Sequence, residues 1–240
     1  MIFRADDNPQ PGGGWVLMDE RTQDLHLKHY ASTHSLLVIS IGYRLAPENP
    51  YPAPNNDCID VGENLIDNAR TTYNAPLLFI GGESAGAHLT VCTTLHLLES
   101  HPDFSFKGLV LNYGVYDLSG FLPQAHILQN APVLTLQGMT AFVEAYLPET
   151  PPLDRKISAI SPLYADLTKL KLPPALFTCG TEDILLDDTV LFYTRWVVAG
   201  GEGVLKLYPG APHGMTSFPL KETDDARRDT VEWVKERMGV

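Results

Sequence analysis

A serine between two glycines stands where a strand pattern meets a helix pattern. The sequence Gly-Glu-Ser-Ala-Gly at residues 82–86 directly follows the apolar run of residues 76–80 and leads into a helical pattern over residues 85–99. Strand, tight turn and helix in that order predict a bend that strains the serine backbone and leaves room only for small neighbours. Ser84 is therefore a candidate nucleophile, although a plain Gly/Ser turn before a helix is the alternative. The N–H of Ala85, at the helix start, would be free to meet a developing negative charge.

An acid and a histidine follow downstream, each after a predicted strand. Asp183 lies in the loop after the apolar run of residues 174–179, and His213 lies in the loop after a strand pattern over residues 203–208. Taken separately, Asp183 is equally a helix N-cap and His213 a solvated surface residue. Serine, acid and histidine in this order and setting predict the triad Ser84–Asp183–His213. The two loops are predicted at residues 180–183 and 209–214.

The acidities of the three groups predict their roles. A serine hydroxyl is too weak an acid to attack a carbonyl unaided, so His213 would take its proton and later protonate the leaving group. Asp183 would hold the imidazole in the right tautomer and stabilise its charged form. Glu182 is the weaker candidate for the acid, because neighbouring side chains on an extended loop point in different directions.

Four segments carry a resemblance to a known family. They are Gly-Gly-Gly-Trp at residues 12–15, Tyr-Arg-Leu-Ala-Pro-Glu at 43–48, Gly-Glu-Ser-Ala-Gly at 82–86, and Asp-Ile-Leu-Leu-Asp at 183–187 with Pro-His-Gly at 212–214. In these segments the chain resembles the hormone-sensitive-lipase-like carboxylesterases of the α/β-hydrolase superfamily. The resemblance implies an α/β-hydrolase fold and a serine esterase that works without a cofactor. It also implies that Gly13 and Gly14 join Ala85 as oxyanion-hole donors, whereas without the other motifs the glycines would indicate only a flexible loop.

The chain departs from the family pattern at its beginning. The family has a histidine before the three glycines, where this chain has Pro11. It also has a substantial segment before that motif, whereas only residues 1–10 precede it here. Ile2 and Phe3 are a candidate remnant of the strand that feeds the glycine loop, and residues 6–9 are typical of a turn. We therefore expect the fold to be truncated at the N-terminus.

Strands and helices alternate along most of the chain. This alternation predicts a mainly parallel sheet covered by helices on both faces, in one α/β domain over residues 1–240. Residues 35–41 form a continuous apolar run, which is typical of a buried parallel strand. The alternation breaks over about residues 117–172, a proline-rich stretch with one amphipathic helix near residues 134–147. So large an insertion favours a cap or lid, although its apolar stripe is equally explained by ordinary core packing.

Composition excludes several other classes. A formal net charge of −12 argues against nucleic-acid binding, which needs a basic surface. No apolar run is long enough to span a membrane. The three cysteines have no Cys-x-x-Cys spacing and the N-terminus has no signal-peptide pattern, so we expect reduced thiols and a cytoplasmic protein. His26 and His29 have no plausible third ligand nearby, and the acidic residues 183–188 do not match a calcium loop, so we expect no metal.

These features predict a serine carboxylesterase that hydrolyses short- to medium-chain carboxylic esters through an acyl-enzyme. Its partner would be a small-molecule ester, and the resemblance allows a homodimer. Two alternatives stay open. The chain could be a non-catalytic ligand-binding relative, since hydrolase folds also serve as receptors, or an N-terminally incomplete and weakly active hydrolase.

Overall fold

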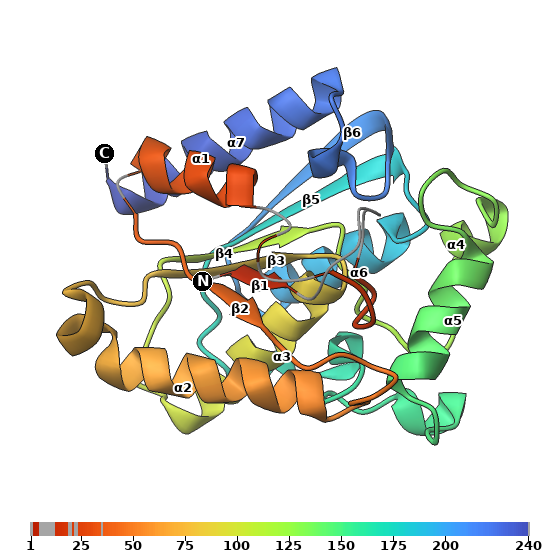
Figure 1. The fold of residues 1–240 in the computed structure, drawn as a ribbon, viewed down its shortest axis with the longest axis horizontal. Coiled ribbons are helices and arrows are strands. Elements are labelled where there is room, and N and C mark those ends of the chain that lie inside the picture. The colour runs from red at the N-terminus through yellow and green to blue at the C-terminus, as the bar shows by residue number, and fades with distance from the viewer. Residues whose placement is uncertain (1, 5–12, 19–20, 22–23, 35, 240) are drawn as a thin grey trace.

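The computed structural model describes residues 2–4, 13–18, 21, 24–34 and 36–239. These residues form a six-stranded sheet in the order β2-β1-β3-β4-β5-β6, with every neighbouring pair parallel (Figure 1). The strands are β1 (Ile2–Arg4), β2 (Ser40–Gly42), β3 (Phe79–Glu83), β4 (Gly108–Asn112), β5 (Ala175–Glu182) and β6 (Gly203–Pro212). The predicted parallel sheet is confirmed, and Ile2 and Phe3 do lie in a strand. Pro11 and the turn expected at residues 6–9 lie outside the described residues.

Helices cover both faces of this sheet, as the alternating pattern predicts. α1 and α7 pack together on one face, while α2 and α3 pack together on the other, where α6 also lies (Figure 1). The helices are α1 (Asp24–His34), α2 (Ala53–Tyr73), α3 (Ala85–Ser100), α4 (Pro123–Ile127), α5 (Leu136–Tyr146), α6 (Leu186–Val198) and α7 (Lys221–Met238). Parallel strands need such crossover connections, which explains why a helix stands between most consecutive strands.

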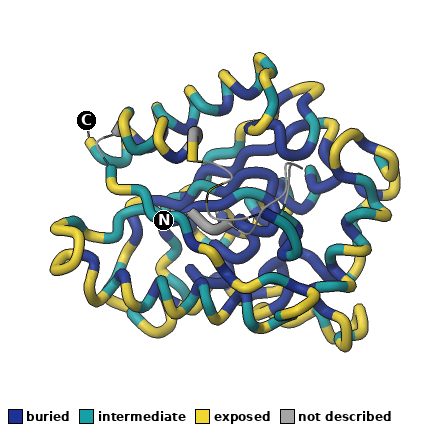
Figure 2. The backbone as a smooth tube through the Cα atoms, viewed as in Figure 1, coloured by how far each residue is buried: buried dark blue, intermediate teal, exposed yellow. Residues whose placement is uncertain are grey.

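The core lies on both sides of the strands because successive side chains point to opposite faces. In β4, Leu109 and Leu111 belong to the large cluster that includes Leu89 of α3, whereas Val110 packs with Trp233 of α7. The strands at the centre of the sheet are accordingly the most buried part of the backbone (Figure 2). A site at the carboxyl ends of these strands therefore stands on a rigid support.

The segment leading into β2 differs from its prediction. The run of residues 35–41 predicts a buried strand, but pairing with β1 begins at Ser40, Leu37 is 56% exposed, and Ser35 lies outside the described residues. β1 pairs with β3 only from Gly81. An apolar run predicts burial but not which strand pairs with it, so the prediction of a strand over the whole run is wrong.

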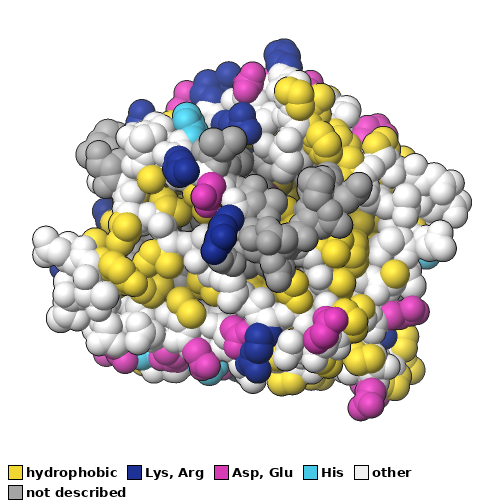
Figure 3. Space-filling view, in the orientation of Figure 1, with side chains coloured by type: hydrophobic (Ala, Val, Ile, Leu, Met, Phe, Trp, Pro, Cys, Tyr) yellow, Lys and Arg dark blue, Asp and Glu magenta, His cyan; other side chains and the backbone are white. Residues whose placement is uncertain are grey.

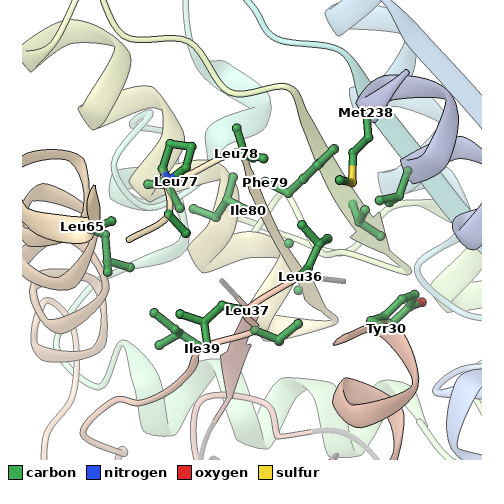
Figure 4. A pocket seen from close by; sticks show the side chains of 18 of the residues that line it. Tyr30, Leu36, Leu37, Ile39, Leu65, Leu77, Leu78, Phe79, Ile80 and Met238 are labelled. Carbon is green, nitrogen blue, oxygen red and sulfur yellow. The ribbon is translucent and has the colours of Figure 1, made fainter. Parts of the chain in front are cut away.

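An apolar cavity of about 310 Å³ lies upstream of these strand pairs, between the segments that lead into β2 and β3 (Figure 4). Its walls include Leu36, Ile39, Leu77, Leu78 and Met238. Figure 3 shows hydrophobic side chains gathered on the side of the molecule that faces the viewer.

The stretch between β4 and β5 contains α4, α5 and three short 3-10 helices. The amphipathic helix predicted near residues 134–147 is confirmed as α5, which buries Met139, Val143 and Tyr146. Its first turn is capped by the hydroxyl of Thr135, which accepts the N–H of Gly138 at 3.0 Å. Figure 1 shows α4 and α5 together at one end of the sheet.

All three cysteines carry free, buried thiols. No helix within the described ranges has both the length and the apolarity needed to cross a bilayer. In the same part of the chain, no three or more His, Cys, Asp or Glu side chains are grouped so that they could hold a metal ion.

Candidate active site

The turn between β3 and α3 holds Ser84 in a strained conformation. Its backbone has φ +54° and ψ −122°, a region that L residues rarely adopt, as the sequence predicts for a serine in such a bend. A Cβ on Gly82 would lie 2.3 Å from the carbonyl of Gly86, so the turn closes only with glycine there. The N–H of Ser84 donates to the carbonyl of Asn112 in β4 at 2.9 Å, which fixes the turn to the sheet.

The strands that carry Asp183 and His213 are longer than the sequence indicates. Residues 180–182 and 209–212 are predicted as loops, but they extend β5 and β6, and Glu182 pairs with Pro212 after a register shift. A Cβ on Gly180 would lie 2.0 Å from the carbonyl oxygen of Ala211, so this glycine permits close strand contact. The loop prediction at these positions is therefore wrong, and Asp183 and His213 directly follow one paired position of the sheet.

The structure brings the three predicted side chains into one hydrogen-bonded row. Ser84 Oγ lies 3.0 Å from His213 Nε2, and His213 Nδ1 lies 2.8 Å from Asp183 Oδ2. The other carboxylate oxygen, Oδ1, accepts the N–H of Leu185 at 2.9 Å. The exposed fractions are 7% for Ser84, 1% for His213 and 0% for Asp183, whereas the neighbouring Glu182 is exposed. Because an ionised carboxylate only accepts, His213 carries its proton on Nδ1 and turns the Nε2 lone pair toward the serine.

A second row of hydrogen-bonded side chains lies beside His213, and the sequence does not predict it. The hydroxyls of Tyr113 and Thr216 lie 2.5 Å apart, and Thr216 donates to the carboxylate of Glu83 at 3.0 Å. The ring of Tyr113 also meets the ring of His213 edge-on, with centroids 5.1 Å apart. Glu83, beside the serine, is thus joined to the 3-10 helix that follows His213. Nothing in the sequence signals this link, because its members come from three separate segments.

The glycine segment lies beside the serine. Gly14 lines a cavity of about 110 Å³ together with Ser84 and His213. Its φ is +48°, and a Cβ there would lie 2.5 Å from the ring of Phe142 in α5, so only glycine fits. The carbonyl of Gly13 accepts the N–H groups of two following residues at 2.7 Å, which tightens this segment into a turn. Ala85 is the first residue of α3, so its N–H has no acceptor within the helix. Gly12 lies outside the described residues.

The segment at residues 43–48 braces the glycine turn. The N–H of Ala46 donates to the carbonyl of Trp15 at 3.0 Å. Arg44 in turn forms a forked contact with the carboxylate of Asp57 in α2, at 2.6 Å for the closest pair of atoms. Residues 43–48 thus have a structural role beside the glycine turn, although they carry no reactive group.

The first turn of α6 holds the start of the 117–172 stretch. Asp188 is buried, and its Oδ1 accepts the N–H groups of Tyr116 and Asp117 at 2.7 and 2.9 Å. Asp187 accepts the N–H of Gln124 at 2.8 Å. The sequence indicates only that these acids suit a helix N-terminus. Their partners lie more than sixty residues away, and burial raises the pKa of Asp188 to about 7.

This pKa predicts a pH-dependent stability. The pKa of Asp188 is raised in the folded state above its ordinary value of 3.8, so the folded protein holds the proton more tightly than the unfolded chain does. The Asp188 contribution to the free energy of unfolding is therefore full below about pH 4 and is lost as the pH rises toward 7, by at most about 1.4 kcal/mol per pH unit. Asp188→Asn keeps an acceptor oxygen but removes the titration, so urea unfolding between pH 4.5 and 8 should show a smaller decline. Asp187→Asn is the matched control, and equal slopes for Asp188→Asn and wild type would refute the assignment.

Comparison with known proteins identifies the fold family of the chain. Residues 11–217 match the family model described as alpha/beta hydrolase fold. An AB hydrolase superfamily protein of Schizosaccharomyces pombe is 31% identical over 214 residues, which are 84% of this chain and 60% of that protein, so the chain spans less than two thirds of this relative. A hormone-sensitive lipase from a metagenome library is 29% identical, with a TM-score of 0.84 over 98% of this chain and 75% of its own. An esterase of Pyrobaculum calidifontis is 28% identical, with a TM-score of 0.84 over 96% of this chain and 78% of its own. The chain therefore belongs to the α/β-hydrolase fold family, within its hormone-sensitive-lipase-like group.

Proposed function

We propose that this protein is a serine carboxylesterase that hydrolyses short- to medium-chain carboxylic esters through an acyl-enzyme. The observation that carries the proposal is the continuous contact from Ser84 Oγ through His213 to the carboxylate of Asp183, at 3.0 and 2.8 Å. A buried carboxylate, an imidazole and a strained serine in line suit acyl transfer.

Each side chain has a role that follows from its contacts. His213 Nε2 takes the proton of Ser84 as Oγ attacks the ester carbonyl, and then gives that proton to the departing alcohol. Asp183, with one oxygen on His213 and the other on the N–H of Leu185, orients the ring and stabilises its charged form. Water then attacks the acyl group on Ser84, again with His213 as the base, and releases the acid.

The negative charge that develops on the ester oxygen needs donors. Ala85 offers the N–H at the start of α3, and we assign the remaining donors to the backbone of Gly13 and Gly14. Support comes from the position of Gly14 on the cavity that Ser84 and His213 also line, where a side chain would collide with Phe142. Removing one such donor typically costs about 3 kcal/mol of transition-state stabilisation.

We assign residues 117–172 to a cap that forms the acyl pocket. The cavity beside the serine is about 110 Å³ in volume, and α5 contributes Met139 and Phe142 to its wall. The rest of the wall is largely apolar. A small apolar pocket favours a short acyl chain over a long one. Its other lining residues from outside the glycine turn are Val115, Val133 and Leu134.

Shortening one wall residue should shift the preferred chain length. Met139→Ala enlarges the pocket, so we expect kcat/KM for octanoyl esters to rise about tenfold relative to butanoyl esters, since each methylene in an apolar pocket contributes about 1 kcal/mol. Stability should fall by about 2–4 kcal/mol. Leu136→Ala, in the same helix but outside the cavity lining, is the control and should leave the preference unchanged. An unchanged preference in Met139→Ala would contradict the assignment of this pocket to the acyl chain.

The proposed function is tested with p-nitrophenyl esters of two to twelve acyl carbons. We expect turnover that is highest for the short and medium chains and unaffected by EDTA. A folded protein that hydrolyses none of these esters, yet binds one of them or its acid tightly, would instead be a ligand-binding relative.

A further inference from the structure

His88 joins two segments that are far apart in the sequence. It lies one helical turn beyond Ser84 in α3 and is 0% exposed. Its Nε2 lies 2.8 Å from the carbonyl oxygen of Ile160, and its Nδ1 lies 3.3 Å from the indole nitrogen of Trp15. A carbonyl only accepts and an indole N–H only donates, so the ring has its proton on Nε2 and its lone pair on Nδ1. Burial lowers the pKa of His88 to about 4, which keeps this neutral form at physiological pH.

Trp15 is the first residue after the glycines whose side chain is held by the surrounding structure. It directly follows Gly14, is fully buried, and lines the same cavity as Ser84. Its ring stacks on Tyr146 of α5 with centroids 4.6 Å apart and planes 8° apart. The stack fixes the plane of the indole, and the hydrogen bond to His88 fixes its rotation within that plane.

We propose that His88 is a positioning residue that holds Trp15 and thereby the backbone of Gly13 and Gly14 beside Ser84. The inference rests on the proposed function. Glycines have no side chain by which to be held and the largest conformational freedom of any residue, so the direction of their N–H groups depends on the contacts of their neighbours. Backbone hydrogen bonds tighten this turn, and the buried side chain of Trp15 adds the contact that ties it to α3 and α5. A displacement of about 1 Å at a reacting centre can cost about 100-fold in rate. His88 itself is not in contact with the reacting atoms. Its polar contacts run to Trp15 in the glycine segment, to Ile160 in the 117–172 stretch, and to Sγ of Cys92 in its own helix, 3.6 Å from Nε2.

Three substitutions separate the two hydrogen bonds. His88→Gln keeps a donor near the position of Nε2 but removes the acceptor for Trp15, whereas His88→Asn keeps an acceptor near the position of Nδ1. Trp15→Phe removes the indole N–H and keeps an aromatic ring on Tyr146. His96→Gln, in the exposed part of the same helix, is the matched control.

Ester hydrolysis by folded protein should then divide these variants. We expect His88→Gln and Trp15→Phe each to lower kcat about 10- to 100-fold with KM within about twofold, and to weaken binding of a trifluoromethyl ketone by a similar factor. The double variant should be no slower than either single one, and His88→Asn should recover most of the rate. Wild-type kcat in His88→Gln, or multiplied losses in the double variant, would overturn the inference.

A second measurement separates this inference from the proposed function. The indole ¹H–¹⁵N resonance of Trp15, assigned with Trp15→Phe, should shift in His88→Gln and stay in place in His96→Gln. An unshifted resonance overturns the inference whether or not the protein hydrolyses esters. A wild type and His96→Gln that are both inactive overturn the proposed function instead.

Discussion

Replacing Ser84 by alanine is expected to lower kcat for a p-nitrophenyl ester by about 10⁶-fold, because the oxygen that forms the acyl-enzyme is lost. The fold should be unaffected. The Ser84 side chain makes no capping hydrogen bond to α3, and its hydrogen bond within the described residues is to His213, so alanine removes little that holds the fold. Initial rates and thermal unfolding, measured on the same preparation, check both halves of the expectation.

Ser100→Ala is the control for this variant. Ser100 ends the same helix and bonds to Glu63 at the surface, so its loss should leave kcat within about twofold. A Ser84→Ala protein that keeps more than about a hundredth of the wild-type rate would mean that another group performs the attack.

Asp183→Asn is expected to have the next largest effect, a loss of about 10⁴-fold in kcat. An amide can present its NH₂ to His213 Nδ1, which favours the tautomer with the proton on Nε2. That tautomer cannot accept the serine proton. The KM should change little, because Asp183 lies behind the histidine and away from the cavity lined by Ser84.

Glu182→Gln tests whether the neighbouring carboxylate could serve instead. Glu182 is exposed and pairs with Pro212 in the sheet, so its replacement should leave kcat within about twofold. A loss in Glu182→Gln equal to that in Asp183→Asn would show that the two acids are not distinguished as the contacts indicate. Both variants should be compared at one pH, with folding verified by circular dichroism.

The features that the sequence predicts well are local ones. The bend at Ser84 follows from glycines two residues away on either side, and α3 follows from the helical pattern over residues 85–99. The meeting of Asp183 with His213 could be expected because parallel strands end at the same edge of a sheet. The structure places His213 2.8 Å from Asp183 and 3.0 Å from Ser84, so the side chains that the order of motifs singles out are in contact.

The features that the sequence does not predict depend on partners far along the chain. Glycine and proline at residues 180–182 and 209–212 are typical of loops, yet cross-strand pairing extends both strands through them. His88 has the pattern of a packing residue in a helix, and its two partners are 72 and 73 residues away. The surroundings of Asp188 also depend on distant residues, because its pKa is set by its burial and by N–H groups about seventy residues earlier in the chain.

Reaction with a fluorophosphonate, followed by intact-mass and peptide mass spectrometry, tests the role of Ser84 most directly. Such a reagent phosphonylates an alcohol only where a base takes its proton. We expect one label per chain, on the peptide that contains Ser84, with none in Ser84→Ala and labelling slowed at least about 1,000-fold in His213→Ala. A folded wild-type protein that takes up no label, or that carries it on a different residue, would contradict the assignment of Ser84 as an activated nucleophile.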